Sequence, residues 1–305
     1  MKRLFCFVLC VLTLIMLEIT LVYTVFASPG TEKIAFTSTR DGNSEIYIMN
    51  PDGSQQQNLT WHSARDLAPA WSPTGQHIAF NSDRDGIRDI YLMDADGKNV
   101  RKVFRSSAYR EYPAWSPDGK KLAYLRAEDW SIYVATVDGE QVERIAPTNS
   151  RGGWPAWSPD GSEIVFVSTD VTGYLLKAVN LQTRKVRVLL PNDEPKTIWD
   201  PAWSPDGALI AFHWYKKGIY TIRKSGRGLK LLVRNASRPA WSPSGDELIY
   251  GKDKQLFKFD LSNRRAKQLT HGAINFGADW SEVKPLSVEP QASQLTTKWA
   301  IIKQR

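Results

Sequence analysis

The chain has 305 residues, of which 42% are hydrophobic and 24% are charged, a composition typical of a soluble globular protein. The formal net charge of +8 is mildly basic, and without an aromatic-plus-basic reading motif it argues against nucleic-acid binding. Both cysteines, Cys6 and Cys10, lie in the amino-terminal segment, which excludes a disulfide framework and a thiolate metal site or nucleophile from the rest of the chain.

The first 27 residues combine a basic start, Lys2 and Arg3, with two apolar runs separated by Glu18 and a small final residue, Ala27. This pattern predicts an export signal that is cleaved after Ala27. The alternative is an uncleaved membrane anchor over residues 4–26, which is long enough to cross a bilayer but carries Glu18. Under either interpretation the remainder is exported, and we expect it to be periplasmic or extracellular.

A tryptophan motif organises the rest of the chain. Pro-Ala-Trp-Ser-Pro occurs five times, and a degraded copy, Ala278-Asp279-Trp280-Ser281, closes the series at intervals of 38 to 46 residues. The repeated tryptophans are Trp71, Trp115, Trp157, Trp203, Trp241 and Trp280. A period near 40 residues indicates a repeat architecture. Since the tryptophan recurs at one position of every copy, we expect it to pack neighbouring repeats rather than to bind a ligand.

Each copy predicts four antiparallel strands. After the tryptophan, Pro-x-Gly leads to an Ile/Leu-x-Phe/Tyr strand, and because Pro presets φ and Gly supplies the left-handed position, this is a tight hairpin. A third strand carries Ile-Tyr or a variant of it, and a short fourth strand follows. With no helical periodicity, the pattern predicts an all-β fold, a β-propeller of four-stranded blades.

The two ends of the repeat region predict the number of blades. The first copy starts at Lys33, already in its second strand, whereas the last copy has a tryptophan strand with no second strand after it. We therefore expect the strand near Trp280 to join the amino-terminal blade and to close a ring of six blades over residues 33–281. Residues 28–32 are a short linker, and residues 282–305 are a carboxy-terminal tail, either frayed or able to dock.

The columns Pro-Ala-Trp-Ser-Pro-Asp-Gly, Ile-Ala-Phe-x-Ser-x-Arg-Asp-Gly and Ile-Tyr-x-Met-Asn/Asp-x-Asp-Gly resemble the WD-type repeats of the TolB-like β-propeller family. The resemblance covers residues 33–281. Similar propellers also precede peptidases of the dipeptidyl-peptidase and acylaminoacyl-peptidase kind. TolB proteins carry an α/β domain ahead of the propeller, and here only residues 28–32 separate the signal from the first blade, so an inner-membrane contact is not implied.

The strand order predicts a turn face, which holds the Pro-x-Gly hairpins, and an opposite face made by loops that differ between blades. Variable loops on a constant scaffold are the usual place for binding residues. The resemblance implies that an envelope protein docks there, at the channel mouth, such as a peptidoglycan-associated lipoprotein. The predicted binding residues are Arg65, Asp66, Arg110, Glu111, Tyr112, Arg151, Trp154, Trp199, Asp200, Arg238, His271 and Phe276. The alternative is that the aromatic residues among them only pack between blades.

We expect no metal site, no cofactor and no catalytic residues. Arg40-Asp41-Gly42 and Arg84-Asp85-Gly86 suit turns, and a calcium loop would need a closing bidentate carboxylate that they lack. There is no Gly-x-Ser-x-Gly nucleophile elbow, and the four histidines lack metal-ligand spacing. The prediction is a monomeric, exported, non-catalytic scaffold that binds an envelope protein or a cell-wall component. The alternative is a metal-assisted hydrolase or lyase at the channel mouth, acting on a carbohydrate.

Overall fold

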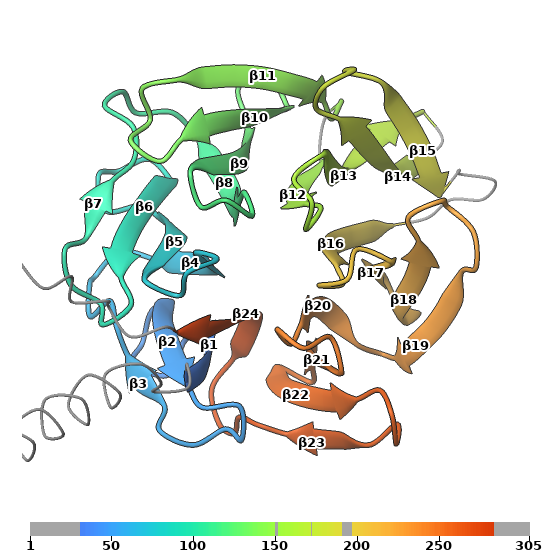
Figure 1. Ribbon diagram of the computed structural model, residues 1–305. Coiled ribbons are helices and arrows are strands. Elements are labelled where there is room, and N and C mark those ends of the chain that lie inside the picture. Colours follow the sequence, from blue (N-terminus) through green and yellow to red (C-terminus); the bar gives the residue numbers. More distant parts are fainter. Residues whose placement is uncertain (1–30, 150–151, 172, 191–196, 284–305) are drawn as a thin grey trace, which may run out of the picture. The chain divides into compact units, whose positions relative to one another are not determined.

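The computed structural model describes residues 31–149, 152–171, 173–190 and 197–283. These residues form six four-stranded antiparallel sheets arranged as the blades of a ring (Figure 1). The six-bladed β-propeller predicted from the repeat is therefore confirmed. The predicted signal segment and most of the predicted tail, residues 284–305, lie outside the described residues. Among the described residues there is no helix long and apolar enough to cross a membrane.

Each blade contributes one strand to each of four concentric layers. The innermost strands are β4 (Asp66–Trp71), β8 (Arg110–Trp115), β12 (Gly153–Trp157), β16 (Ile198–Trp203), β20 (Ser237–Trp241) and β24 (Asn275–Val283). The second strands are β1 (Thr31–Ser38), β5 (His77–Ser82), β9 (Lys121–Arg126), β13 (Glu163–Asp170), β17 (Leu209–Trp214) and β21 (Glu247–Lys252). The third strands are β2 (Glu45–Met49), β6 (Asp89–Asp94), β10 (Ser131–Thr136), β14 (Gly173–Asn180), β18 (Gly218–Arg223) and β22 (Gln255–Asp260). The outermost strands are β3 (Gln57–Asn58), β7 (Arg101–Lys102), β11 (Val142–Pro147), β15 (Val186–Leu190), β19 (Lys230–Arg234) and β23 (Ala266–Gln268).

The two ends of the described chain close the ring in one sheet. Blade 1 has the strand order β24-β1-β2-β3, and blades 2 to 6 each take four consecutive strands from β4 onward. Trp280 lies opposite Ile34 in the antiparallel pair of β24 and β1. This pairing confirms the predicted closure. It covers the inner edge of β1, which could otherwise pair with another chain.

The Pro-x-Gly segments form the predicted tight turns. In blade 2 the Gly75 N–H donates to the Ser72 carbonyl at 2.8 Å, and Gly75 has a φ of +67°. The Ser72 hydroxyl accepts a hydrogen bond from the backbone N–H of His77 at 3.0 Å. The serine and the glycine together stabilise the turn, which explains why Trp-Ser-Pro-x-Gly recurs as one unit.

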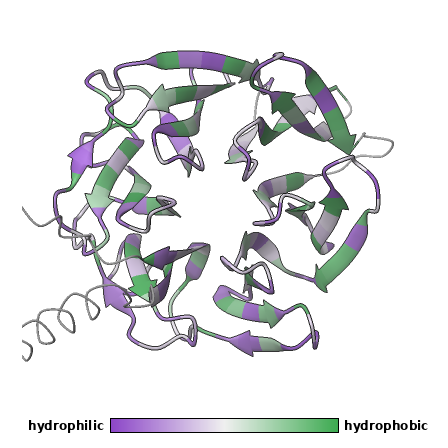
Figure 2. Cartoon of the chain, in the orientation of Figure 1, coloured by the Kyte–Doolittle hydropathy of each residue, from purple (hydrophilic) through white to green (hydrophobic). Residues whose placement is uncertain are grey.

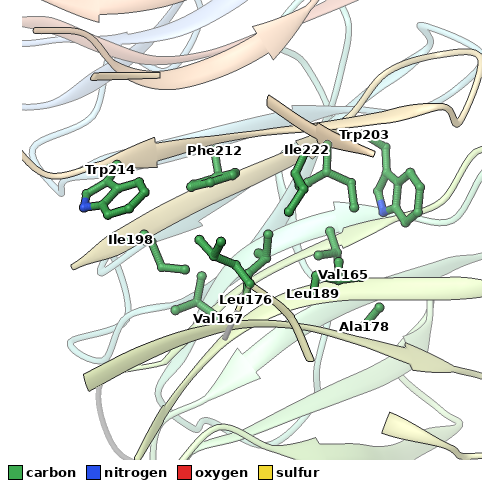
Figure 3. Packing of buried hydrophobic residues seen from close by; sticks show 12 residues of the cluster. Val165, Val167, Leu176, Ala178, Leu189, Ile198, Trp203, Phe212, Trp214 and Ile222 are labelled. Atoms are coloured by element: carbon green, nitrogen blue, oxygen red, sulfur yellow. The ribbon is translucent and has the colours of Figure 1, made fainter. Parts of the chain in front are cut away.

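Hydrophobic side chains fill the spaces between neighbouring blades. Figure 3 shows Phe212 and Trp214 of blade 5 facing Val167 and Leu176 of blade 4, all of them at most 6% exposed. Burial of each such side chain contributes about 1.5–3 kcal/mol. Figure 2 shows that the hydrophobic residues concentrate on the strands of the blades, whereas the short outer strands β3 and β7 are hydrophilic. The core is thus divided among the blade interfaces rather than gathered in one centre.

The repeated tryptophans take part in this packing. The indole nitrogen of Trp115 donates to the Ala70 carbonyl of the preceding blade at 3.0 Å, and that of Trp241 donates to the Ala202 carbonyl at 3.1 Å. Within the described chain, the other four indole nitrogens are buried without a hydrogen-bond partner, namely those of Trp71, Trp157, Trp203 and Trp280. The tryptophans therefore connect blades, as the sequence predicts.

Candidate functional site

A backbone irregularity occurs at the same place in every innermost strand. Each of these strands shifts register against its neighbour around the residue that lies three positions before the tryptophan. At this position φ lies between 51° and 60° in all six blades, at Ala68, Tyr112, Trp154, Asp200, Arg238 and Gly277. A residue other than glycine adopts this left-handed conformation at a cost of roughly 1–2 kcal/mol. Such bulges redirect side chains and are frequent beside functional sites.

The bulge residues line a cavity along the axis of the ring. This channel has a volume of about 1160 Å³ and extends from the Pro-x-Gly turns, at Pro73 and Pro205, to Glu111 and Trp199 at the opposite end. The ribbons leave the axis open in Figure 1, and the tryptophan-bearing strands surround it. The loops that connect one blade to the next, and those between second and third strands, form the loop face at the Trp199 end of the channel.

Aromatic rings follow the channel wall across three blades. The centroids of Tyr112 and Trp154 lie 4.8 Å apart, and those of Trp154 and Trp199 lie 6.4 Å apart. Tyr174 and Tyr215 extend the series at 6.2 and 5.4 Å from Trp199. We call Tyr112, Trp154 and Trp199 the aromatic arc. The rings contact one another between blades and also line the channel, and their role in binding stays a prediction.

Three ionisable side chains stand beside the arc. The Asp200 carboxylate lies 3.9 Å from Nδ1 of His213 and is 21% exposed, toward the channel. Burial raises the pKa of Asp200 to about 6, and the positive charge of Arg238 acts in the opposite direction. Burial, and then Arg238, lowers the pKa of His213 to about 4. At neutral pH the site therefore presents a carboxylate, a neutral imidazole and a guanidinium, which lies 4.6 Å from the Phe276 ring centroid.

Asp279 is a channel residue that the sequence reasoning missed. It occupies the position that is alanine in the five complete motifs, and its carboxylate accepts a hydrogen bond from the backbone N–H of Trp71 at 2.6 Å. Burial raises the pKa of Asp279 to about 6. The contact joins the closing strand β24 to β4 of blade 2. The replacement of alanine by an acid in the last copy was the signal that could have identified it.

Two of the predicted binding residues lie inside blades. Asp66 is fully buried and accepts from Arg84 at 3.0 Å, and Arg110 is buried against Asp89 at 2.9 Å. The Arg110 guanidinium also lies 3.9 Å from the Phe104 ring centroid. Both residues stand five positions before the repeat tryptophan, and this position is buried in every blade. Their charges are neutralised within the fold and do not reach the channel.

The remaining predicted residues are divided between the channel and the surrounding loops. Glu111 lines the channel and accepts from Arg88 at 2.5 Å. Arg65 is exposed and donates to Asp83 at 2.8 Å. His271 is also exposed, 3.1 Å from the Gln268 side-chain nitrogen, and it does not line the channel. Arg151 lies outside the described residues.

The Arg-Asp-Gly segments make a structural contact that recurs in two blades. The Arg40 guanidinium lies 4.4 Å from the Tyr47 ring centroid, and the Tyr47 hydroxyl donates to Asp41. Arg84, Asp85 and Tyr91 repeat this arrangement in blade 2. The aspartates are therefore occupied by tyrosine hydroxyls. Among the residues that the structure describes, no three His, Cys, Asp or Glu side chains are grouped to hold a metal ion.

Large exposed apolar side chains gather on the loop face. Of eleven such residues in the described chain, seven lie in loops of this face, and the other four lie on outermost strands or just before one. The seven are Trp61, Ile87, Tyr109, Trp130, Val171, Tyr215 and Ile274. Trp61 is 75% exposed and Trp130 is 37% exposed. On the turn face, Leu229 lies in the connection between β18 and β19, so the exposed apolar side chains of the described chain are concentrated on the loop face.

Comparison with known proteins agrees with the fold and the repeat. The model of the TolB β-propeller domain matches residues 23–104 and 88–282. The chain belongs to this family. A segment of 47 residues is 51% identical to the Tol-Pal system protein TolB of Geobacter sulfurreducens, and it covers 15% of this chain and 11% of that TolB.

Solved structures extend the likeness over most of the ring. TolB from Acinetobacter baumannii superimposes with a TM-score of 0.72 at 19% identity, covering 83% of this chain and 67% of that one. An oligogalacturonate lyase in complex with manganese superimposes with a TM-score of 0.57 at 18% identity, covering 78% and 74%. At these identities both structures show the fold alone.

Proposed function

We propose that this TolB-family propeller is an exported, non-catalytic scaffold that binds a protein of the cell envelope on its loop face and at the channel mouth. The observation that carries the proposal is the concentration of exposed apolar side chains on that face, around the aromatic arc. Clustered apolar surface on a soluble protein marks interaction sites. Aromatic and arginine side chains, as found here at Trp154, Trp199 and Arg238, are the usual anchors of interfaces.

The relatives and the amino-terminal sequence support the proposed partner class and location. Two similar sequences are named Tol-Pal system protein TolB, which supports an envelope partner such as a peptidoglycan-associated lipoprotein. The basic and apolar pattern of residues 1–27 supports export, by a cleaved signal or a retained anchor. We propose a monomer with the ring as the binding module; Thr31 and Glu32, which the sequence placed in a linker, belong to β1 of this ring.

The catalytic alternative rests on fold likeness alone. A metal-assisted hydrolase or lyase at the channel mouth would share its fold with the oligogalacturonate lyase, at 18% identity. In the described part of the chain, no group of three potential metal ligands lines the channel. The exposed apolar loops, in contrast, extend well beyond the channel and suit a macromolecular surface. We therefore propose binding.

Photo-crosslinking in cells tests the docking face. p-Benzoylphenylalanine replaces Trp130 or Tyr215 on the loop face, or Lys120 or Lys224 on the turn face, all of them exposed. We expect one envelope protein to crosslink to both loop-face positions and to neither turn-face position. The adducts are identified by mass spectrometry.

A triple variant, Trp154→Ala/Trp199→Ala/Arg238→Ala, provides the companion measurement. It removes two rings of the arc and the neighbouring guanidinium, so the loop-face adduct should fall at least about tenfold, since anchor residues carry most interface energy. Circular dichroism and thermal unfolding establish that the variant is folded. Equal crosslinking from both faces, or an unchanged adduct in the folded triple variant, would contradict the proposed docking face.

A further inference from the structure

The cations on the loop face of blades 5 and 6 make no ion pair in the described chain. They stand at the loop-face ends of β19 and β21, in the loops β17–β18 and β21–β22, and at the bulge of β20. We call these residues the basic patch: Lys216, Lys217, Arg234, Arg238, Lys252 and Lys254. Within the described chain none of the six makes an ion pair. Five of them are exposed, and Lys252 is partly buried. One exposed carboxylate, Asp253, lies in the same loops.

The loop face of blades 2 and 3, in contrast, is neutralised. There the loop-face arginines pair with carboxylates at distances of 2.5 to 3.1 Å. The pairs are Arg65 with Asp83, Arg84 with Asp66, Arg88 with Glu111, Arg110 with Asp89 and Arg126 with Asp129. In the described chain, the loop-face cations that make no ion pair are concentrated in blades 5 and 6, and Arg40 of blade 1, which hydrogen-bonds to Ser38 and Asn275, is a further one. Positive charge that is concentrated on one side of a face attracts negatively charged partners and orients them.

Tight hairpins hold the patch in a defined arrangement. Lys252 pairs with Gln255 across a turn of two residues, Asp253 and Lys254, whose φ values are 51° and 64°. The Asn235 N–H donates to the Lys217 carbonyl at 3.2 Å, which ties the loop of blade 5 to the start of blade 6. Because the backbone of these loops is already ordered, little conformational entropy is lost when a partner binds to the charged side chains.

A hollow lies between the two blades beside these charges. It has a volume of about 270 Å³ and is lined by Tyr215, Lys216, Asn235 and Lys252, among others. Tyr215 is 49% exposed, and its ring centroid lies 5.4 Å from that of Trp199 at the end of the aromatic arc. The patch therefore combines cations with an apolar anchor and continues into the channel mouth.

We propose that the basic patch receives an acidic segment of the protein partner, whose carboxylates pair with the lysines while an apolar side chain packs on Tyr215 in the hollow. This inference rests on the proposed function and specifies the chemistry of the partner. The hollow, the apolar anchor and the concentration of cations in two neighbouring blades favour a protein segment over a lipid surface. A flat membrane would also contact the ion pairs of blades 2 and 3, whose desolvation is costly.

Fluorescence anisotropy measures the predicted preference with a defined probe. The probe is a fluorescein-labelled peptide of about twelve residues built from Glu, Asp, Leu and Trp, and its control carries Gln and Asn in place of every acid. We expect the acidic peptide to bind at least about tenfold more tightly, and this advantage to shrink as ionic strength rises from about 0.05 to about 0.3 M. Equal affinity for both peptides would overturn the inference.

Charge-reversed variants locate the binding. Lys216→Glu/Lys252→Glu/Lys254→Glu should weaken binding of the acidic peptide about tenfold or more, because three favourable pairs become repulsive. The matched control, Lys120→Glu/Lys185→Glu/Lys224→Glu, makes the same change of net charge with exposed lysines on the turn face and should leave affinity within about twofold. Equal weakening by both variants would show attraction to net charge alone and overturn the inference.

Further outcomes distinguish failure of the acidic-segment inference from failure of the proposed function. Tighter binding to vesicles containing 30% phosphatidylglycerol than to the peptide, lost in the same loop-face variant, would assign the patch to lipid and overturn the inference. If the cellular adduct at Trp130 and Tyr215 persists in the loop-face charge variant, the docking face stands and the acidic-segment inference fails. If that adduct is absent already in the wild-type background, the proposed function fails instead.

Discussion

At the scale of single residues, one strand position decides which side chains reach the channel. Three positions before the repeat tryptophan the bulge directs Tyr112, Trp154, Asp200 and Arg238 to the axis, whereas five positions before it every residue is buried in a blade. Sequence variation between blades pointed to the segment that contains these bulges. It did not distinguish these two positions. A bulge changes which residues of the strand face the channel, and the amino-acid composition of the strand does not reveal the bulge.

The indole hydrogen bonds between blades predict different costs for two similar substitutions. Trp241 and Trp203 are 8% and 9% exposed, but only the Trp241 indole nitrogen has a partner, the Ala202 carbonyl. Both changes to phenylalanine remove similar buried area. We therefore expect Trp241→Phe to lower the free energy of unfolding by about 1 kcal/mol more than Trp203→Phe does, as measured by urea denaturation. Equal losses would mean that the hydrogen bond contributes nothing net.

The raised pKa of Asp200 predicts how stability depends on pH. A carboxyl group whose folded-state pKa is raised to about 6 contributes fully below its unfolded value near 4, and this contribution is lost as pH rises through 6. Asp200→Asn cannot ionise. We expect it to match the wild type near pH 4 and to exceed its free energy of unfolding by about 1–2 kcal/mol at pH 7, as measured by denaturant titration at each pH.

A matched aspartate should respond in the opposite sense. Asp206 accepts hydrogen bonds from the Ser204 hydroxyl at 2.5 Å and from the Ala208 N–H at 3.0 Å, and the hydroxyl contact is the main cause of its lowered pKa. Its contribution is present above the unfolded pKa and is lost as pH falls. Asp206→Asn should therefore destabilise the protein at pH 7 more than at pH 3. If the free energies of unfolding of the two variants changed with pH in the same way, the raised pKa assigned to Asp200 would be wrong.

At the scale of strands and turns, the closing strand makes one turn unlike the others. A Cβ atom on Gly75 would lie 2.3 Å from the Glu282 carbonyl oxygen at the end of β24, whereas a Cβ on Gly119 meets nothing closer than 3.8 Å. Their φ values, +67° and +69°, are nearly the same, so the backbone strain of a substitution is matched. The difference between them reports the contact with the closing strand.

Alanine substitutions at these two glycines test this contact. Both variants pay the cost of a left-handed alanine, but Gly75→Ala must also displace the backbone of β24. We expect it to lower the free energy of unfolding by about 1–3 kcal/mol more than Gly119→Ala, as measured by chemical denaturation. Equal effects would indicate that β24 yields at no cost.

At the scale of the whole molecule, the ring depends on strands from both ends of the repeat region. The pair of β1 and β24 joins Ile34 to Trp280, and the Asp279 carboxylate links β24 to Trp71 of blade 2. Without β24, blade 1 loses its innermost strand, and the edge of β1 becomes available to other chains.

Two truncations measure the importance of closure. A chain that ends at Gly272 lacks β24, and we expect its melting temperature to fall by roughly 10 °C or more, with aggregation on size-exclusion chromatography. A chain that ends at Val283 retains every strand pair of the ring and should melt like the full chain, as measured by calorimetry. Cooperative unfolding of the shorter chain at the original temperature would show that closure is dispensable.

The repeat in the sequence is sufficient to predict the blades, their number and their closure. These features depend on local chemistry that repeats every 38 to 46 residues, such as a Pro-x-Gly turn, an alternating strand and a tryptophan. Which charged side chains are free to bind a partner depends on the tertiary structure. Arg84 forms an ion pair with Asp66, whereas in the described chain Lys216 forms none. The channel wall also depends on the tertiary structure, since Tyr112, Trp154 and Trp199 meet only when three blades surround one axis.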